Sequence, residues 1–158
     1  MSTMEKISSL AGRIRWRSVL AALLLLAVLA VVWKTMPSGF SVFGGVGIRV
    51  TATPSSVGPG GSSVLEVELQ NVNAKGDVSM TVKAQTYDRN IYFEESNSQT
   101  YGSSSITIGP QETRKVKLKV KTRPEALEGQ YSLDFTATQP GEEKGPETRI
   151  TLTVEKAS

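Results

Sequence analysis

One uncharged apolar run dominates the N-terminal part of this chain. Residues 19–33 carry no charged side chain, follow a basic stretch at residues 13–17, and have no equally apolar counterpart later in the sequence. Counted from Trp16 to Trp33, a helix would reach about 27 Å at roughly 1.5 Å per residue, close to the ~30 Å hydrocarbon layer of a bilayer. The run therefore predicts one transmembrane helix over residues 16–34.

The two ends of this predicted helix carry side chains suited to a membrane interface. Trp16 and Trp33 are the chain's only tryptophans, and indole rings favour the level of the lipid headgroups. Arg15, Arg17 and Lys34 can extend their charged ends outward into water. We interpret these five residues as the membrane anchor and the lipid bilayer as the partner that they contact.

The distribution of basic residues predicts the direction of the span. Four basic side chains precede it and two follow it closely: Lys6, Arg13, Arg15 and Arg17 against Lys34 and Arg49. Because the more basic flank stays in the cytoplasm, residues 1–15 are predicted to be the cytoplasmic tail of a single-pass plasma-membrane protein with an extracytoplasmic C-terminal domain. The formal net charge of +3 comes largely from this tail, so it gives no argument for nucleic-acid binding.

A cleaved secretory signal is the alternative interpretation of the same run. Residues 28–30, Val-Leu-Ala, resemble a small-residue cleavage site after the apolar run 20–27, and cleavage there would release a secreted soluble domain. We favour the uncleaved anchor, because no polar region precedes that site and the apolar stretch continues through Trp33.

Residues 35–47 are predicted to be a Gly-rich linker. They contain four glycines and one proline, a composition typical of a flexible connector. The apolar residues Phe40, Val42 and Phe43 are expected to rest in the membrane interface. The alternative is that this segment adds a strand to the sheet of a neighbouring protein.

From Ile48 onward, apolar and polar residues alternate with a period of two, and Gly, Pro and Asn turns interrupt the alternation. The pattern predicts an all-β fold, an Ig-like antiparallel β-sandwich of seven or eight strands over residues 48–158. The candidate strands fall at residues 48–52, 65–69, 78–84, 91–93, 106–108, 116–120, 131–137 and 150–154.

Three turn segments carry a resemblance to a known type of module. They are residues 55–61 with a Pro-Gly turn, residues 108–112 with a Gly-Pro turn, and residues 124–131 with a Pro-X-X-Ala-X-X-Gly-X-Tyr corner. In these features the chain resembles the Ig-like modules of the alpha-galactosidase-associated and CARDB type over about residues 50–155. The resemblance implies a spacer, adhesion unit or scaffold in a prokaryotic envelope protein, archaeal or bacterial, and not an enzyme.

The residue inventory itself argues against catalysis. The chain has neither His nor Cys, which excludes the common Ser-His-Asp triads, thiol nucleophiles and typical zinc sites. Glu66 and Glu68 alternate with apolar residues and are expected to face solvent, and the acidic pairs at 94–95 and 142–143 lack the spacing of a calcium loop. We therefore expect no enzyme activity, no cofactor and no metal.

Four lysines form the most distinctive predicted surface feature. Lys115, Lys117, Lys119 and Lys121 alternate with apolar residues, which places them on one face about 6.6 Å apart. We interpret this lysine row as a device that keeps the sheet soluble and prevents edge pairing. The alternative is docking to an anionic partner such as an acidic protein face, a wall polymer or lipid headgroups.

Four aromatic residues cluster around the polar segment 94–104. They are Tyr87, Tyr92, Phe93 and Tyr101, and packing in the core or at the end of the sandwich is their expected role. The alternative is a sugar-stacking or protein-binding patch, in which Tyr92 and Tyr101 would join the lysine row.

Together these features predict a membrane-anchored structural or interaction module. A lone helix followed by a lone sandwich is typical of an accessory subunit of a larger envelope or membrane complex, whose partners are other envelope proteins. The alternative function is recognition of surface glycans or wall polymer.

Overall fold

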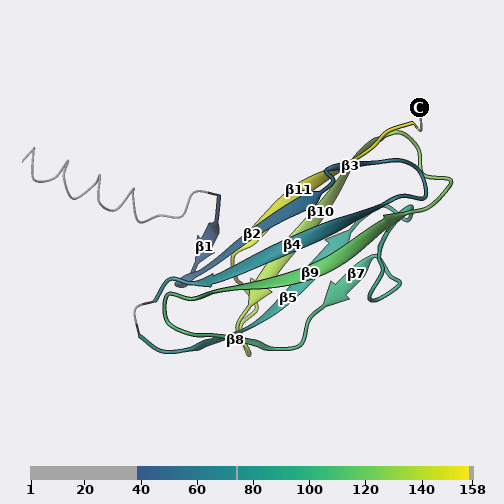
Figure 1. Cartoon of the computed structure of the whole chain (residues 1–158). Coiled ribbons are helices and arrows are strands. Elements are labelled where there is room, and N and C mark those ends of the chain that lie inside the picture. The colour runs from purple at the N-terminus through teal and green to yellow at the C-terminus, as the bar shows by residue number, and fades with distance from the viewer. Residues whose placement is uncertain (1–38, 74, 157–158) are drawn as a thin grey trace, which may run out of the picture. The chain divides into compact units, whose positions relative to one another are not determined.

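A computed structural model of the chain describes residues 39–73 and 75–156 (Figure 1). The chain divides into two units, residues 1–38 and 39–158, and only the second contains described residues. The predicted cytoplasmic tail, the transmembrane helix over 16–34 and all five anchor residues therefore lie outside the described residues. Within the described residues, no helix has the length and apolar character needed to cross a membrane.

The described residues form eleven strands in two sheets, which confirms the all-β prediction. Sheet A has the order β1-β2-β4-β9-β6, and sheet B has the order β3-β11-β10-β5-β7, with β8 paired to β5. The strands of sheet A are β1 (Ser41–Phe43), β2 (Val46–Thr53), β4 (Ser62–Asn71), β6 (Ile91–Phe93) and β9 (Thr113–Thr122). Those of sheet B are β3 (Ser56–Val57), β5 (Val78–Thr86), β7 (Thr100–Gly102), β8 (Ile106–Ile108), β10 (Gly129–Thr138) and β11 (Glu147–Val154).

The strand order is that of an Ig-like sandwich. The run β2-β4-β9-β6 reproduces the A-B-E-D sheet of the Ig constant-type fold, and β5, β10 and β11 take the places of strands C, F and G. The first long strand, β2, ends at Thr53, just before Pro54, and the chain then crosses to sheet B, where β3 pairs in parallel with β11. Every other strand pairing that the structure describes is antiparallel.

The prediction of seven or eight strands was too low. All eight candidate strands are present, as β2, β4, β5, β6, β8, β9, β10 and β11. The three missed strands, β1, β3 and β7, are two or three residues long. An alternation with a period of two cannot be recognised over so short a segment, because only tertiary pairing identifies it as a strand.

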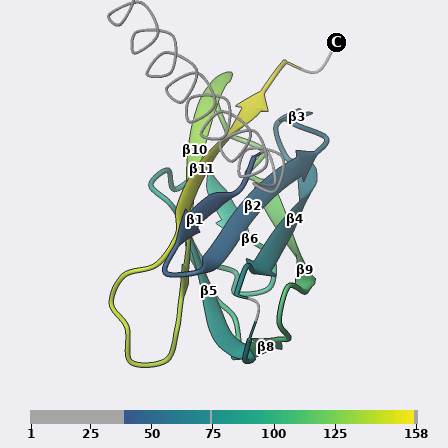
Figure 2. The same ribbon diagram turned by 90° about the vertical axis from the view of Figure 1, so that its left-hand side faces the viewer.

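The predicted Gly-rich linker is wrong from Ser41 onward. Residues 41–43 pair antiparallel with residues 46–48, so the sandwich begins at β1 and not at Ile48 (Figure 2). The connecting residues Gly44 and Gly45 have φ angles of 58° and 80°, as a two-residue type I′ hairpin requires. These glycines therefore build a tight turn, and the segment pairs with its own β2. Residues 35–38 lie outside the described part of the chain.

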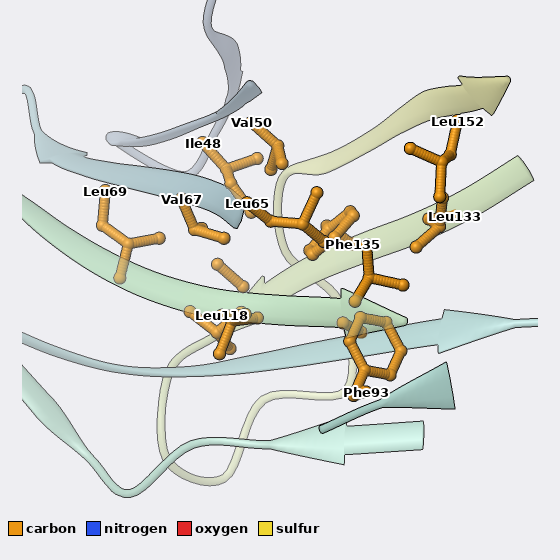
Figure 3. Close-up of a cluster of buried hydrophobic side chains, with 14 of the residues drawn as sticks. Ile48, Val50, Leu65, Val67, Leu69, Phe93, Leu118, Leu133, Phe135 and Leu152 are labelled. Atoms are coloured by element: carbon orange, nitrogen blue, oxygen red, sulfur yellow. The ribbon is translucent and has the colours of Figure 1, made fainter. Parts of the chain in front are cut away.

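The inner faces of the two sheets bury the alternating apolar residues (Figure 3). Side chains such as Leu65 and Leu118 in sheet A face Leu133 and Leu152 in sheet B, and all four are buried. Burial of each large apolar side chain contributes about 1.5–3 kcal/mol, and this core stabilises a domain that has no disulfide.

Asn71 fixes the loops at one end of the sandwich. Its side chain is fully buried at the end of β4. The amide nitrogen donates to the carbonyl oxygens of Gly76 at 3.0 Å and Ile108 at 3.2 Å, and Oδ1 accepts from the Asn73 amide at 3.0 Å. One side chain thus satisfies the backbone of two separate loops.

Replacing Asn71 by Ala should lower the free energy of unfolding by about 2–4 kcal/mol, because it leaves buried backbone groups without partners. Chemical denaturation followed by circular dichroism measures this loss. The matched control is Gln130→Ala at an exposed position of β10, which should change stability by less than about 0.5 kcal/mol. Equal stability of the two variants would contradict the assigned role of Asn71.

Candidate interaction surfaces

The lysine row lies on the outer face of β9, where its first member is held by carboxylates of the neighbouring strand. Lys115 faces Glu68 in the register of β4 and β9. Its Nζ lies 2.6 Å from Glu66 Oε1 and 2.9 Å from Glu68 Oε1. The hydrogen bonds to Glu66 and then to Glu68 raise the pKa of Lys115. The two glutamates that were expected to face solvent are therefore partners of the row.

Glu68 is the centre of a row of charges across three strands. Arg49 on β2 donates from Nε to Glu68 Oε2 at 2.7 Å and also forms an ion pair with this oxygen through Nη2. The hydrogen bond from Lys115 is the main cause that lowers the pKa of Glu68; burial opposes this change, and Arg49 adds to it. The carboxylate is buried beneath its two cationic partners.

Lys119 and Lys121 share a second carboxylate, Glu94. Glu94 follows β6 and lies 3.2 Å from Lys119 Nζ and 2.5 Å from Lys121 Nζ. Hydrogen bonds from Lys121 and then Lys119 lower the pKa of Glu94. The adjacent Glu95 accepts a hydrogen bond from the Lys119 backbone amide at 2.7 Å. Glu94 is therefore shared by the last two lysines of the row, and Lys117 is the one member without an ion pair among the described residues.

The aromatic residues do not form one patch. Phe93 is fully buried, and its ring lies 6.3 Å from that of half-buried Tyr101, which confirms the expected packing role for Phe93. Burial also raises the pKa of Tyr101. Tyr92 faces Lys121 on sheet A, with the Arg123 guanidinium 5.4 Å from its ring centre. Tyr87 directly follows β5 of sheet B and is 67% exposed.

The structure reveals a hollow on the outer face of sheet B that the sequence did not predict. Its volume is about 630 Å³, and β5, β7, β10 and β11 supply its walls. We call it the sheet B hollow. The lining residues with polar side-chain groups are Lys83, Gln85, Tyr87, Thr100, Tyr101, Asp134, Thr136, Glu147, Thr148 and Arg149.

Asp134 organises the sheet B hollow. It accepts hydrogen bonds from Arg149 Nε at 2.5 Å and Nη2 at 2.8 Å, and from the Tyr87 hydroxyl at 3.1 Å. Arg149 is the main cause that lowers the pKa of Asp134, and the hydrogen bond to Asp134 raises the pKa of Tyr87. The hollow thus presents a fixed guanidinium, a carboxylate and a phenol side by side.

Sequence reasoning singled out Tyr87 and Tyr101, which line this hollow, but missed its charged residues because they come from distant strands. Asp134 faces Gln85 on β5 and Arg149 on β11, which are far apart in the chain. The available signal was a pair of opposite charges at outward positions of two strands joined by a hairpin. Without the register, that pair could not be distinguished from ordinary solvated charges.

Replacing Glu68 by Gln should lower the free energy of unfolding at neutral pH by about 1–2 kcal/mol, because Arg49 and Lys115 lose their shared carboxylate. The pKa of Glu68 is lowered in the folded state, so its contribution is present above the unfolded pKa of about 4.3 and is lost as the pH falls through the folded value. The stability difference from wild type should therefore shrink between about pH 6 and pH 3.

Denaturant unfolding at several pH values measures this difference. The control is Glu142→Gln, which alters an exposed loop carboxylate and should leave stability unchanged across the same range. A pH-independent difference for Glu68→Gln would show that the carboxylate acts through packing and not through its charge.

Comparisons with known proteins identify the fold and no family. No family model matches the sequence, and no curated protein matches it. Many solved structures are similar, and three of them show the range of proteins. The FixG-related protein of Vibrio parahaemolyticus is 12% identical with a TM-score of 0.50, and the match covers 72% of this chain and 99% of that chain.

Two further similar structures come from different kinds of protein. The CARDB domain of the PF1109 protein from Pyrococcus furiosus, solved in complex with di-metal ions, is 18% identical with a TM-score of 0.52, covering 71% of this chain and 94% of that chain. The alpha-2-macroglobulin of Escherichia coli is 14% identical with a TM-score of 0.57, covering 72% of this chain and 7% of that chain. At these identities the similarity shows the fold alone, and it agrees with the CARDB-type resemblance at that level.

Proposed function

We propose that this chain is a single-pass membrane protein whose extracytoplasmic Ig-like sandwich is a non-catalytic structural or interaction module. In this proposal it serves as an accessory subunit of a larger envelope or membrane complex. The uncharged run at residues 19–33 and the basic flank before it support the anchor and its direction. The similarity to Ig-like and other β-sandwich domains is compatible with a module that binds or spaces other proteins.

The sheet B hollow is the observation that carries the interaction role. Its charged side chains stand on three paired strands, so they are presented on a rigid surface. Asp134 already orients Arg149 and Tyr87, which reduces the entropy lost when a partner binds. The lysine row is the weaker candidate, because carboxylates of the domain itself bind three of its four members and the row does not line the hollow.

Protease added to intact cells, or to spheroplasts where an outer layer blocks access, should remove the sandwich and leave an N-terminal epitope tag protected. The protein should also stay with the membrane after carbonate extraction, because a spanning helix is held by the hydrocarbon layer. Immunoblotting against tags at both ends checks both results. Recovery of a soluble chain that lacks residues 1–30 would support the cleaved secretory signal, and a protease-sensitive N-terminus would reverse the topology.

Recognition of surface glycans or wall polymer is the second candidate function. The exposed ring of Tyr87 beside the paired Asp134 and Arg149 favours it, because sugars bind to aromatic faces flanked by side chains that can form hydrogen bonds. The sheet B hollow is therefore shared by both candidate functions, and its ligand distinguishes them.

Replacing Tyr87 by Ala should weaken binding at the sheet B hollow about tenfold, equivalent to about 1.4 kcal/mol, because an exposed aromatic side chain contributes strongly to recognition. To test the interaction module, membrane proteins cross-linked to each variant are recovered and compared. To test the glycan function, the purified variants are bound to a glycan array and to isolated cell wall. The matched control is Tyr92→Ala on the outer face of sheet A. If Tyr87→Ala and Tyr92→Ala lose binding equally in both assays, the hollow is not the binding site.

A further inference from the structure

The strand register places two opposite charges on either side of Thr136 in the sheet B hollow. Lys83 of β5 and Glu147 of β11 both face Thr136 of β10, and all three residues line the hollow. Neighbouring strands lie about 4.8 Å apart, so the Cα atoms of Lys83 and Glu147 are separated by roughly 10 Å. Both side chains are exposed, and neither forms an ion pair within the described part of the chain. These two charges are therefore available to a ligand.

The other two charges of the hollow are already paired with each other. Asp134 and Arg149 face one another in the next outward row of β10 and β11, and Arg149 donates to Asp134 through Nε and Nη2. The Tyr87 hydroxyl also donates to Asp134 at 3.1 Å. This pair forms an internally neutral wall, so Lys83 and Glu147 decide which charged groups the hollow attracts.

The charge balance of the hollow selects the class of ligand. Two cationic and two anionic residues line it, so its formal net charge is zero. A purely anionic or purely cationic ligand gains little at such a site, because the attraction of one charge is opposed by the repulsion of the other. The arrangement favours a ligand that is neutral overall and carries opposite charges at its two ends.

The size of the hollow favours a small ligand. Its volume of about 630 Å³ lies within the range of about 300–1,000 Å³ that is usual for small-molecule sites. An extended peptide gains about 3.5 Å per residue, and each charge-assisted hydrogen bond adds about 2.8 Å. A zwitterion of one or two residues that is bound at both ends therefore bridges about 9–13 Å. This length matches the separation between Lys83 and Glu147.

We propose that the sheet B hollow binds a short peptidic zwitterion, an amino acid or a dipeptide, whose carboxylate pairs with Lys83 and whose ammonium group pairs with Glu147. The half-buried Thr136 lies between the two charges, where its hydroxyl can form a hydrogen bond with the middle of the ligand. This inference rests on the proposed function in one respect, that the hollow is the binding site of the module, and it adds the chemical class of the ligand.

Binding of dialanine to the full-length chain in phosphatidylcholine nanodiscs tests this proposal. Saturation-transfer difference NMR measures the dissociation constant, and empty nanodiscs give the background. We expect a dissociation constant of about 1 mM, because so small a ligand makes few contacts. Acetylating the amine of dialanine, or converting its carboxylate to an amide, should each weaken binding about fivefold, because each change removes one exposed ion pair.

Variants of the two charged residues assign each contact. Lys83→Gln should weaken dialanine binding about fivefold and make dialanine and its amide bind equally, while acetylation still weakens binding. Glu147→Gln should remove the effect of acetylation and keep the effect of the amide. The matched control is Lys117→Gln, which alters an exposed lysine without an ion pair on the outer face of sheet A and should leave all three dissociation constants unchanged.

The outcomes separate this inference from the proposed function. Equal binding of dialanine and its two blocked forms to the unchanged chain would overturn the proposal, as would an equal loss of binding in Lys117→Gln and Lys83→Gln. If dialanine does not bind but Tyr87→Ala still weakens partner recovery or glycan binding, the zwitterion is wrong and the hollow remains the binding site. If dialanine does not bind and Tyr87→Ala changes neither assay, both proposals for the hollow are wrong.

Discussion

Phe93 and Phe135 meet edge to face across the core, with ring centres 6.3 Å apart and planes at 85°, and they join the two sheets. Phe93 belongs to β6 in sheet A and Phe135 to β10 in sheet B, so this contact sets which face of each strand is inside (Figure 3). Because neighbouring residues of a strand point to opposite faces, burying Phe135 directs Asp134 outward into the sheet B hollow. Burying Phe93 likewise directs Tyr92 outward beside the lysine row. Both candidate surfaces thus follow from the requirement to bury the same core.

The register of the strands then decides what those outward charges do. Lys115 and Glu68 are far apart in the sequence, but they face one another across β4 and β9, and Arg49 faces Glu68 from the other side. Each exposed ion pair contributes little stability by itself, about 0–1 kcal/mol. These ion pairs instead affect how the surface can bind other molecules. A lysine that is held by a carboxylate attracts an anionic partner less strongly. In sheet A most of these charges are paired with one another. In the sheet B hollow Asp134 and Arg149 are paired as well, but Lys83 and Glu147 have no ion pair within the described part of the chain.

Much of the fold could be predicted from the sequence, because each long strand shows a regular alternation of apolar and polar residues. The alternation around Leu65, Leu118 and Leu133 identified all three strands and their buried faces, and the turn residues separated them correctly. The β1 hairpin was missed, since Gly44 and Gly45 have the composition of a linker and only pairing with β2 shows that they form a turn. The ion pairs and the sheet B hollow were missed for a related physical reason. They depend on cross-strand register, which turns and long-range packing set together.

Correcting the linker changes how the domain can be connected to a membrane. A flexible connector of thirteen residues, 35–47, would let the sandwich turn freely, whereas an ordered β1 leaves at most residues 35–40 between the predicted span and the first strand. A shorter connection restricts the orientations available to a domain and raises the effective concentration of its nearest surface at the bilayer. In the proposed membrane-anchored arrangement, the sheet B hollow would therefore meet a partner from a restricted range of orientations.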